Sequence, residues 1–485
     1  MSAVYGDAAD LPANAQAVEY AKICFAYGAG YYQIPGTDTC LNFSGYTRFD
    51  AYINATGGFN PAIASVADTM FASPGAGVSG YPLVTKTAPT YLAHVRSVFN
   101  LDARTATDYG VFRSYIRISG EWDSEAGVGG PPGGVFDFER AFIQLAGFTF
   151  GYTQSFFDSG VQYMFTQHYG GSNKTTLIGY TLPLDAGLSL WMSLEDPVNR
   201  TTGTQDAPAS GTFTNGTQLT GLNGIVYADT QSGRQAPDMV FNVQLDRDWA
   251  RLMVSGALHN VSGITPTGYD GILYPGAGTM STWGGALGLS AEFQLPMLAP
   301  GDSIYFQYNY ANGALSYLGL SGSYEGRVTG LGRITLNGTS PSGGFYPIAD
   351  AIWTGSDYAK ETGWALETQF RHFWQPNLRS SAYAGYVRID VPANAVFSPS
   401  NLSLLPAGAL FNDGFSVEVA QVGVNTVWSP VKNLDLGVEV LYSKVNGSLP
   451  LTSGIIAGTP QAGTLALFGG SVGVWAGGVR AQRNF

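Results

Sequence analysis

The sequence predicts an all-β protein, a closed antiparallel transmembrane β-barrel of 16 strands. Three observations lead to this fold class. The chain of 485 residues holds Gly 65, Tyr 28, Phe 27 and Trp 9 but only 12% charged residues, a composition that favours aromatic strands and turns over helices. Many segments alternate apolar and polar residues with the period of a strand. Very short turns and long polar connections also follow each other in strict alternation.

The segment GVFRSYIRISGEW, residues 110–122, illustrates the alternating pattern. Arg113, Tyr115 and Arg117 share one face, while Ile116 and Ile118 share the other. A half-buried strand of a soluble protein and a strand of a membrane barrel both show this pattern, so a single strand does not decide between them.

The lengths of the turns and connections favour the membrane barrel over a soluble β protein. After a first strand at 41–53, strand pairs turn at 106–110, 145–148, 183–187, 245–250, 296–302, 373–377 and 429–433, and a last strand ends at Phe485. One strand, seven hairpins and one strand give an even number that can close into a ring. Short periplasmic turns and long extracellular loops are the arrangement of bacterial outer-membrane barrels. A tandem β-sandwich or a propeller would not confine its long loops to alternate connections.

Helical membrane spans and nucleic-acid binding are both disfavoured. The longest apolar candidate, 465–479, is interrupted by five glycines and does not read as a membrane helix. The formal charge of -12 comes without any run of Lys or Arg that could neutralise phosphates. We therefore expect no nucleic-acid partner.

We expect two parts, an N-terminal periplasmic segment at 1–40 and the barrel at 41–485. The two cysteines, Cys24 and Cys40, flank a turn-rich loop in the first part. They could form a disulfide worth about 3 kcal/mol, or remain two free buried thiols. The stretch after Met1 has neither a basic start nor an apolar core, and we expect that an export signal has been removed.

Several stretches resemble the general porins of alphaproteobacterial outer membranes, the trimeric 16-stranded family of the rhizobial type. They lie at 17–52, 101–118, 139–158 and 427–444, and the ending VRAQRNF is also similar. The resemblance implies an outer-membrane location, a Cys24–Cys40 disulfide, and a C-terminal Phe485 recognised by the barrel-assembly machinery. It also implies a homotrimer in contact with outer-membrane lipid and lipopolysaccharide.

The expected function is that of a porin. A barrel of 16 strands is too wide to be filled by its own side chains and encloses water. In the family that the chain resembles, the third long loop folds into the channel and narrows it. Here that loop begins at 155–171 and would bring Asp158 opposite the inward-pointing Arg48, Arg113, Arg117 and Arg140. The alternatives are an ordinary surface loop and arginines that are simply solvated.

Ions and small hydrophilic solutes would then pass by passive diffusion, and we expect a mild preference for cations. A sugar-specific or peptide-specific channel, and a surface adhesin or receptor, are the alternatives to a general porin. We expect no enzymatic activity. The four histidines, His94, His168, His259 and His372, are scattered, with no GxSxG motif beside them and without metal-ligand spacing. No catalytic residue, cofactor or metal is therefore predicted.

Overall fold

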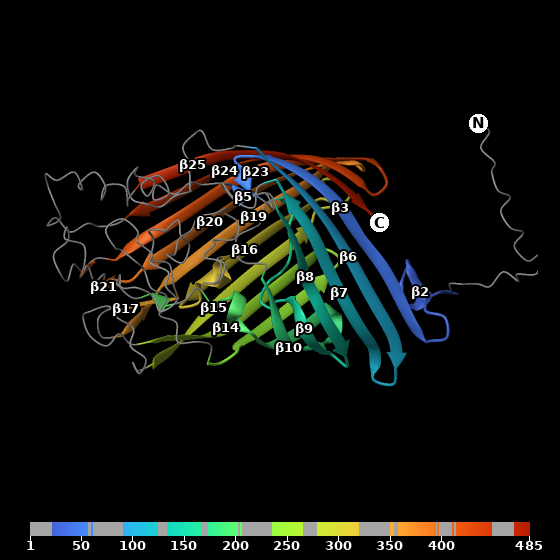
Figure 1. The fold of residues 1–485 in the computed structure, drawn as a ribbon, viewed down its shortest axis with the longest axis horizontal. Coiled ribbons are helices and arrows are strands. Elements are labelled where there is room, and N and C mark those ends of the chain that lie inside the picture. Colours follow the sequence, from blue (N-terminus) through green and yellow to red (C-terminus); the bar gives the residue numbers. More distant parts are fainter. Residues whose placement is uncertain are drawn as a thin grey trace, which may run out of the picture.

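The structure is a computed structural model that describes the chain except for residues 1–21, 57–59, 62–90, 125–132, 166–172, 202–203, 206–234, 265–278, 320–349, 354–356, 394, 397–409, 412–413 and 449–469. It is a closed β-barrel whose strands are tilted relative to the barrel axis (Figure 1). The main sheet has 18 strands, of which β1 and β2 lie outside the ring and 16 form it. The predicted fold class is confirmed.

The ring strands are all antiparallel to their neighbours. They are β3 (Thr39–Ile53), β6 (Tyr91–Thr107), β7 (Gly110–Asp123), β8 (Gly133–Leu145), β9 (Phe148–Gln154), β10 (Lys174–Pro183), β11 (Leu188–Glu195), β13 (Asp238–Arg247), β14 (Ala250–Ile264), β15 (Thr279–Gln294), β16 (Ser303–Asn312), β19 (Thr362–Gln375), β20 (Leu378–Val391), β23 (Phe415–Val431), β24 (Leu434–Ser448) and β25 (Gly470–Asn484).

Short elements occupy the described parts of the connections. They are β4 (Ala55–Thr56), β5 (Asn60–Pro61), η2 (Asp185–Gly187), η3 (Pro197–Asn199), β12 (Thr204–Gln205), η5 (Leu315–Leu318), β17 (Ala351–Trp353), β18 (Tyr358–Lys360), β21 (Ala395–Val396) and β22 (Leu410–Phe411). Within the described ranges, no helix has the length and apolarity to span a membrane.

The ring closes between its first and last strands. β25 pairs with β3 from Gly477↔Ile53 to Asn484↔Tyr46. Beyond that register, Gly45 and Phe485 exchange two backbone hydrogen bonds of 3.0 Å each. A Cβ on Gly45 would lie 2.0 Å from the Val98 carbonyl oxygen, so this close strand approach requires glycine.

All seven predicted short turns join neighbouring ring strands at one end of the barrel. The turn between β8 and β9 has Ala146 at φ 51° and Gly147 at φ 86°. Two consecutive residues with positive φ are what a two-residue hairpin needs to follow the twist of its strands. Local turn chemistry therefore sets the register of this hairpin.

The two faces of the strands meet different surroundings. Along β24, Val438 and Val440 are about half exposed on the outside, while Glu439 and Ser443 are buried on the inside. The same alternation gives an outer surface of exposed apolar side chains on most ring strands. An apolar exterior and a polar interior are the arrangement of a barrel that faces lipid and encloses water.

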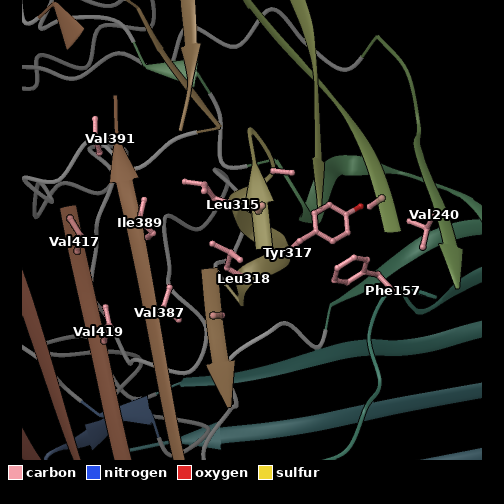
Figure 2. Packing of buried hydrophobic residues seen from close by; sticks show 14 of the residues in the cluster. Phe157, Val240, Leu315, Tyr317, Leu318, Val387, Ile389, Val391, Val417 and Val419 are labelled. Atoms are coloured by element: carbon pink, nitrogen blue, oxygen red, sulfur yellow. The ribbon is translucent and has the colours of Figure 1, made fainter. Parts of the chain in front are cut away.

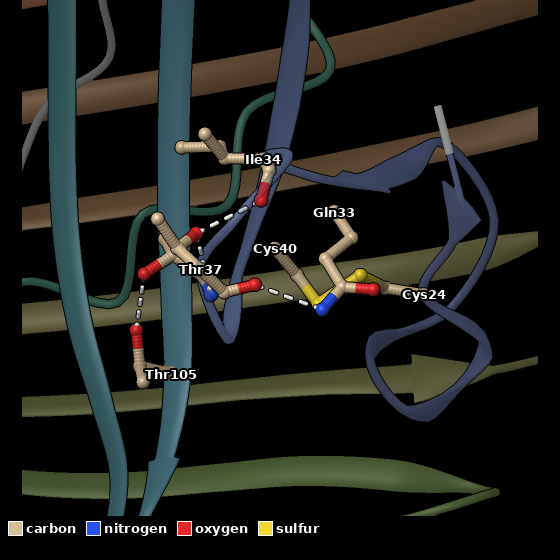
Figure 3. The surroundings of a disulfide bond; sticks show 7 residues. Cys24, Gln33, Ile34, Thr37, Cys40 and Thr105 are labelled. Carbon is tan, nitrogen blue, oxygen red and sulfur yellow. Dashed lines mark hydrogen bonds between the residues drawn. A yellow bond between two sulfur atoms is a disulfide. The ribbon is translucent and has the colours of Figure 1, made fainter. Parts of the chain in front are cut away.

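The N-terminal segment adds two short strands to the main sheet outside the ring. It consists of β1 (Lys22–Ile23), η1 (Phe25–Tyr27) and β2 (Tyr31–Gln33). β2 pairs with β3 from Tyr31↔Asn42 to Gln33↔Cys40, at the end of β3 that β25 does not reach. The Cys24–Cys40 disulfide expected from the resemblance is formed and fastens this segment to β3 (Figure 3).

An arginine placed on the lipid-facing side should show how deeply each position is buried in the membrane. Val440→Arg, near the middle of β24, should lower the free energy of unfolding by about 2–4 kcal/mol, because the charge would face hydrocarbon. Val431→Arg, beside a short turn, should lower it by only about 0–1 kcal/mol, because the side chain can reach the headgroups. Guanidinium titration of the protein in lipid vesicles measures both values. Equal losses would contradict the assignment of the outer face.

Candidate functional site

The connection that follows β9 runs along the inner wall of the barrel. Phe156 N–H donates to Glu195 Oε1 of β11 at 2.9 Å, and Asn242 of β13 donates to the Phe156 carbonyl at 2.7 Å. Ser255 of β14 donates to the Phe157 carbonyl at 2.9 Å. The first residues of the third long loop are therefore fixed to three successive ring strands from the inside.

The same segment then reaches the far side of the ring. Tyr163 N–H donates to Gln369 Oε1 of β19 at 2.6 Å, and its hydroxyl donates to Glu292 of β15. Phe165 N–H donates to Glu439 Oε2 of β24 at 2.7 Å. The Phe165 ring lies 4.1 Å from the Arg480 guanidinium of β25. Residues 155–165 thus contact the interior from β11 to β25.

Glycines on the wall make room for the aromatic rings of this segment. A Cβ on Gly437 would lie 2.4 Å from Phe165 Cζ, and a Cβ on Gly179 would lie 2.5 Å from Phe156 Cε2. Glycine at these two positions therefore permits the rings to lie directly on the sheet. Steric fit and the hydrogen bonds described above favour the same path for the segment.

Asp158 is anchored at the base of this segment by Arg200. Arg200 Nη2 lies 2.7 Å from Asp158 Oδ2, and both side chains are fully buried. The Arg200 guanidinium also lies 4.2 Å from the ring of Tyr317. Burial acts to lower the pKa of Arg200, but its attraction to Asp158 and Tyr317 outweighs burial and raises it. Arg200 therefore stays charged beside Asp158.

A second inward segment packs beside the first. η5, in the connection after β16, places Leu315, Tyr317 and Leu318 against apolar residues of β19, β20 and β23 (Figure 2). Val387 and Val417 belong to this cluster and are fully buried. Apolar side chains on the inner face of the ring are thus covered by η5, and Asn309 fixes it by donating to the Tyr317 carbonyl at 2.7 Å. No pattern in the sequence indicated that η5 folds inward.

The opposite part of the inner wall is lined by arginines. Arg48 of β3 lies directly opposite Arg96 of β6 in the strand register. Asp50 balances part of the positive charge. Arg48 Nε lies 2.8 Å from its Oδ2, and Arg480 Nε lies 2.7 Å from its Oδ1. Arg96 pairs with Glu121 and Glu139. Like charges directly opposite each other are destabilising, so these carboxylates are needed to hold the arginines together.

A β-bulge turns two consecutive residues of β8 toward the interior. The pairing of β7 with β8 shifts between Arg117↔Arg140 and Ile118↔Phe138, which leaves Glu139 as the extra residue. Glu139 Oε2 accepts from Arg117 Nε at 2.7 Å, and Arg140 Nη2 donates to the Gln154 side chain at 3.3 Å. Bulges re-aim side chains in this way. Regular alternation would have sent one of the two outward.

Arg113 lies nearer the short-turn end of the barrel. Its Nη2 lies 2.8 Å from Asp102 Oδ2, and Arg104 Nη2 lies 2.9 Å from the same oxygen. Tyr31 of the N-terminal segment donates to Asp102 Oδ2 at 2.8 Å. Burial and this hydrogen bond raise the pKa of Tyr31. The disulfide-bound segment is thereby connected to the charged interior.

Sequence reasoning selected four of these arginines but missed their neighbours. Arg96, Lys174 and Arg480 contact the same carboxylates as the selected arginines. The inward parity of Arg96 on β6 and Arg480 on β25 was a usable signal. Arg200 lies after η3, outside any alternating pattern, so its pairing with Asp158 could not be inferred.

Three of the four histidines are paired with aspartates. His94 Nδ1 lies 2.7 Å from Asp123, His259 Nδ1 2.7 Å from Asp238, and His372 Nδ1 2.6 Å from Asp302. His168 lies outside the described residues. These pairs are structural contacts, and none stands beside a nucleophile motif in the sequence.

Among the described residues, His94, Glu121 and Asp123 form the one group close enough to share a metal ion. Glu121 already pairs with Arg96, and Asp123 with His94. Both carboxylates therefore have protein partners, and we assign no metal to the group.

A family model for the porin subfamily matches residues 9–457. The chain belongs to the porin subfamily. This porin is 30% identical over 195 residues to Porin Omp2b of Brucella suis, covering 37% of this chain and 46% of that protein. It is 31% identical over 196 residues to Porin Omp2a of Brucella melitensis, covering 37% and 48%. The chain thus spans less than half the length of these curated relatives.

A solved structure shares the fold of this porin along almost the whole chain. The crystal structure of the outer membrane channel DcaP of Acinetobacter baumannii has a TM-score of 0.55 and 16% identity, and covers 92% of this chain and 97% of that one. At this identity the likeness concerns the fold alone. The family and the barrel together place this porin in the outer membrane. They indicate a channel protein and not an enzyme.

The Asp158–Arg200 pair should be sensitive to loss of one partner. Arg200→Met should lower the free energy of unfolding by about 3–5 kcal/mol, because it leaves a buried carboxylate without its counter-charge. The control Arg251→Met removes an exposed pair with Asp246, 3.5 Å apart, and should lower it by less than about 1 kcal/mol. Denaturant titration in vesicles compares the two variants. Similar small losses would mean that Arg200 does not hold the loop.

Proposed function

We propose that this porin forms a water-filled channel for passive diffusion of ions and small hydrophilic solutes, narrowed where its third long loop faces the arginine wall. By arginine wall we mean the inner face that carries Arg48, Arg113, Arg117 and Arg140. The observation that supports the proposal is the run of contacts between residues 155–165 and the interior from β11 to β25. A ring of 16 strands alone would leave a wide opening.

Fixed charges on the wall explain which solutes would pass. Guanidinium and carboxylate groups hold oriented water at the narrow part of the channel. An apolar solute would have to displace that water without replacing its hydrogen bonds, whereas a hydrated ion or small polar molecule need not. Asp158 contributes to the narrowing by pairing with Arg200, which fixes the base of the third long loop.

Recording in planar bilayers tests the channel. The purified protein should give discrete steps of conductance that rise with salt concentration without saturating, and uncharged solutes of increasing size should define the opening. Protein that is folded and inserted but gives no conductance would refute the proposal. Block by one sugar or peptide at low concentration would favour a substrate-specific channel instead.

Charge reversal on the wall should change ion selectivity. Replacing Arg113 and Arg117 together by Glu should shift the reversal potential toward cations, because four units of positive charge are lost along the path of the ions. The reversal potential in a salt gradient measures the effect. If it does not move, the two residues do not line the narrow part.

We also propose that the porin is a homotrimer, with the wall of β9 to β11 facing its neighbours. β9 has 7 residues and β11 has 8, fewer than the roughly 9–11 that a tilted strand needs to cross a bilayer. We call the outer face of β9, β10 and β11 the low wall. Phe148, Phe150 and Ile178 are exposed on it. A second copy would cover these apolar groups, while lipid and lipopolysaccharide surround the taller walls. Recognition of Phe485 by the barrel-assembly machinery remains part of the proposal.

Crosslinking distinguishes the low wall from the others. A photoreactive amino acid in place of Ile178 should join protomers into dimers and trimers on irradiation, because that position would lie at an interface. The same substitution at Leu289 on β15, which is similarly exposed, should give only monomers. A monomer mass in detergent, or equal crosslinking at both positions, would contradict the proposed assembly.

A further inference from the structure

The arginine wall holds more positive than negative charge. On β3, β6, β7, β8 and β25 and at the start of β10, the described inward-facing residues include eight cationic and six acidic side chains. The cationic ones are Arg48, Arg96, Arg104, Arg113, Arg117, Arg140, Lys174 and Arg480; the acidic ones are Asp50, Asp102, Glu121, Asp123, Asp137 and Glu139. Asp123 is itself paired with His94.

At the two best-shielded ion clusters of the wall, the cations are more exposed to channel water than the carboxylate that they share. The side chains of Arg117 and Lys174 are 25% and 30% exposed, whereas that of Glu139, which they share, is 5% exposed. Asp102 is 8% exposed beneath Arg113 at 26%. Three of the six carboxylates, Asp50, Asp102 and Glu139, are therefore shielded from solutes, while the other three remain accessible.

Three arginine pairs lie directly opposite each other in the strand register. They are Arg48↔Arg96, Arg104↔Arg113 and Arg117↔Arg140. Such pairs are unfavourable unless an anion lies between them. In the first two pairs both arginines contact a carboxylate, whereas in the third only Arg117 does. Arg140 has a neutral partner, Gln154, and its buried Nε has no hydrogen-bond partner among the described residues.

Lys174 adds to the positive charge around Arg140. It lies close enough to Arg96, Arg140 and Arg117 for all three to repel its charge, while Asp137 attracts it. Its Nζ lies 3.5 Å from Glu139 Oε2, an oxygen already bound by Arg117. One shared carboxylate oxygen thus faces two cations, and Arg140 stands beside them.

On the opposite side of the channel, most of the described inward carboxylates are buried. Between β9 and β10 the third loop, 155–173, has Asp158 as its one carboxylate in the sequence, and Arg200 neutralises it. Glu195 and Glu439 on the facing strands are buried and accept hydrogen bonds from the loop backbone. The described residues 155–165 therefore cover acids on their own side of the channel.

We propose that the interior is an anion-selective path, with its strongest anion-attracting site at Arg117, Arg140 and Lys174. Small inorganic anions and small solutes with a carboxylate or phosphate group would be drawn there in preference to cations. This inference rests on the proposed channel and gives it a substrate class. It is the opposite of the mild cation preference expected from the sequence.

Reversal potentials in a gradient of KCl across a planar bilayer test the inference. The unmodified porin should be about threefold more permeable to chloride than to potassium near 0.1 M salt, where charges act over about 10 Å. The ratio should fall toward one near 1 M salt, where the screening length is about 3 Å. Arg140→Gln and Lys174→Gln should each lower it about twofold at low salt, because each removes one charge from the site.

The control is Arg247→Gln, which removes an exposed positive charge from the outer face at a short turn and should leave the ratio unchanged. Heat-dependent mobility on gels confirms that each variant is folded; if Arg140→Gln does not fold, the partly exposed Lys174 carries the test. An open channel with a chloride to potassium ratio of one or less overturns the inference and leaves the channel intact. A folded protein without conductance removes the channel itself. An effect of Arg247→Gln equal to that of Lys174→Gln would refute the site.

Discussion

The structure depends on one constraint, that every backbone N–H and C=O group inside the membrane must find a hydrogen-bond partner within the protein. An open sheet would leave two unpaired edges in hydrocarbon, so the pairing of β25 with β3 is a requirement for insertion. Closure then imposes the two faces, because side chains alternate strictly along each strand. It also encloses a lumen too wide for the wall to fill, which other segments must occupy.

Two segments enter that space and are held there by different forces. Residues 155–165 are fixed by carboxylates and amides of the wall, as when Phe165 N–H donates to Glu439. η5 is fixed mainly by apolar contact, with Leu318 and Tyr317 fully buried in one cluster (Figure 2). The burial of Asp158 against Arg200 connects the two, since Arg200 also lies over the Tyr317 ring. Each segment therefore supports the other.

The ring could be predicted from the sequence because its signals are local. Alternation along 110–122 and the short turns around residues such as Asn433 depend on neighbours in the chain. The inward arginines followed from the same alternation, but the bulge at Glu139 did not, because its extra residue breaks the period. The inward course of η5 and the Arg200 partner of Asp158 depend on contacts between distant segments, for which a single sequence carries no periodic signal.

The seam between the first and last strands has a consequence for biogenesis. Asp50 and Arg480, which pair across it, are 430 positions apart. Contacts of such separation give the fold a high contact order, so ring formation is slow compared with the formation of single hairpins. Until β25 pairs with β3, the chain carries two bare strand edges able to pair with other chains. Escort of these edges across the periplasm is therefore as much a requirement of this fold as the lipid that finally surrounds it.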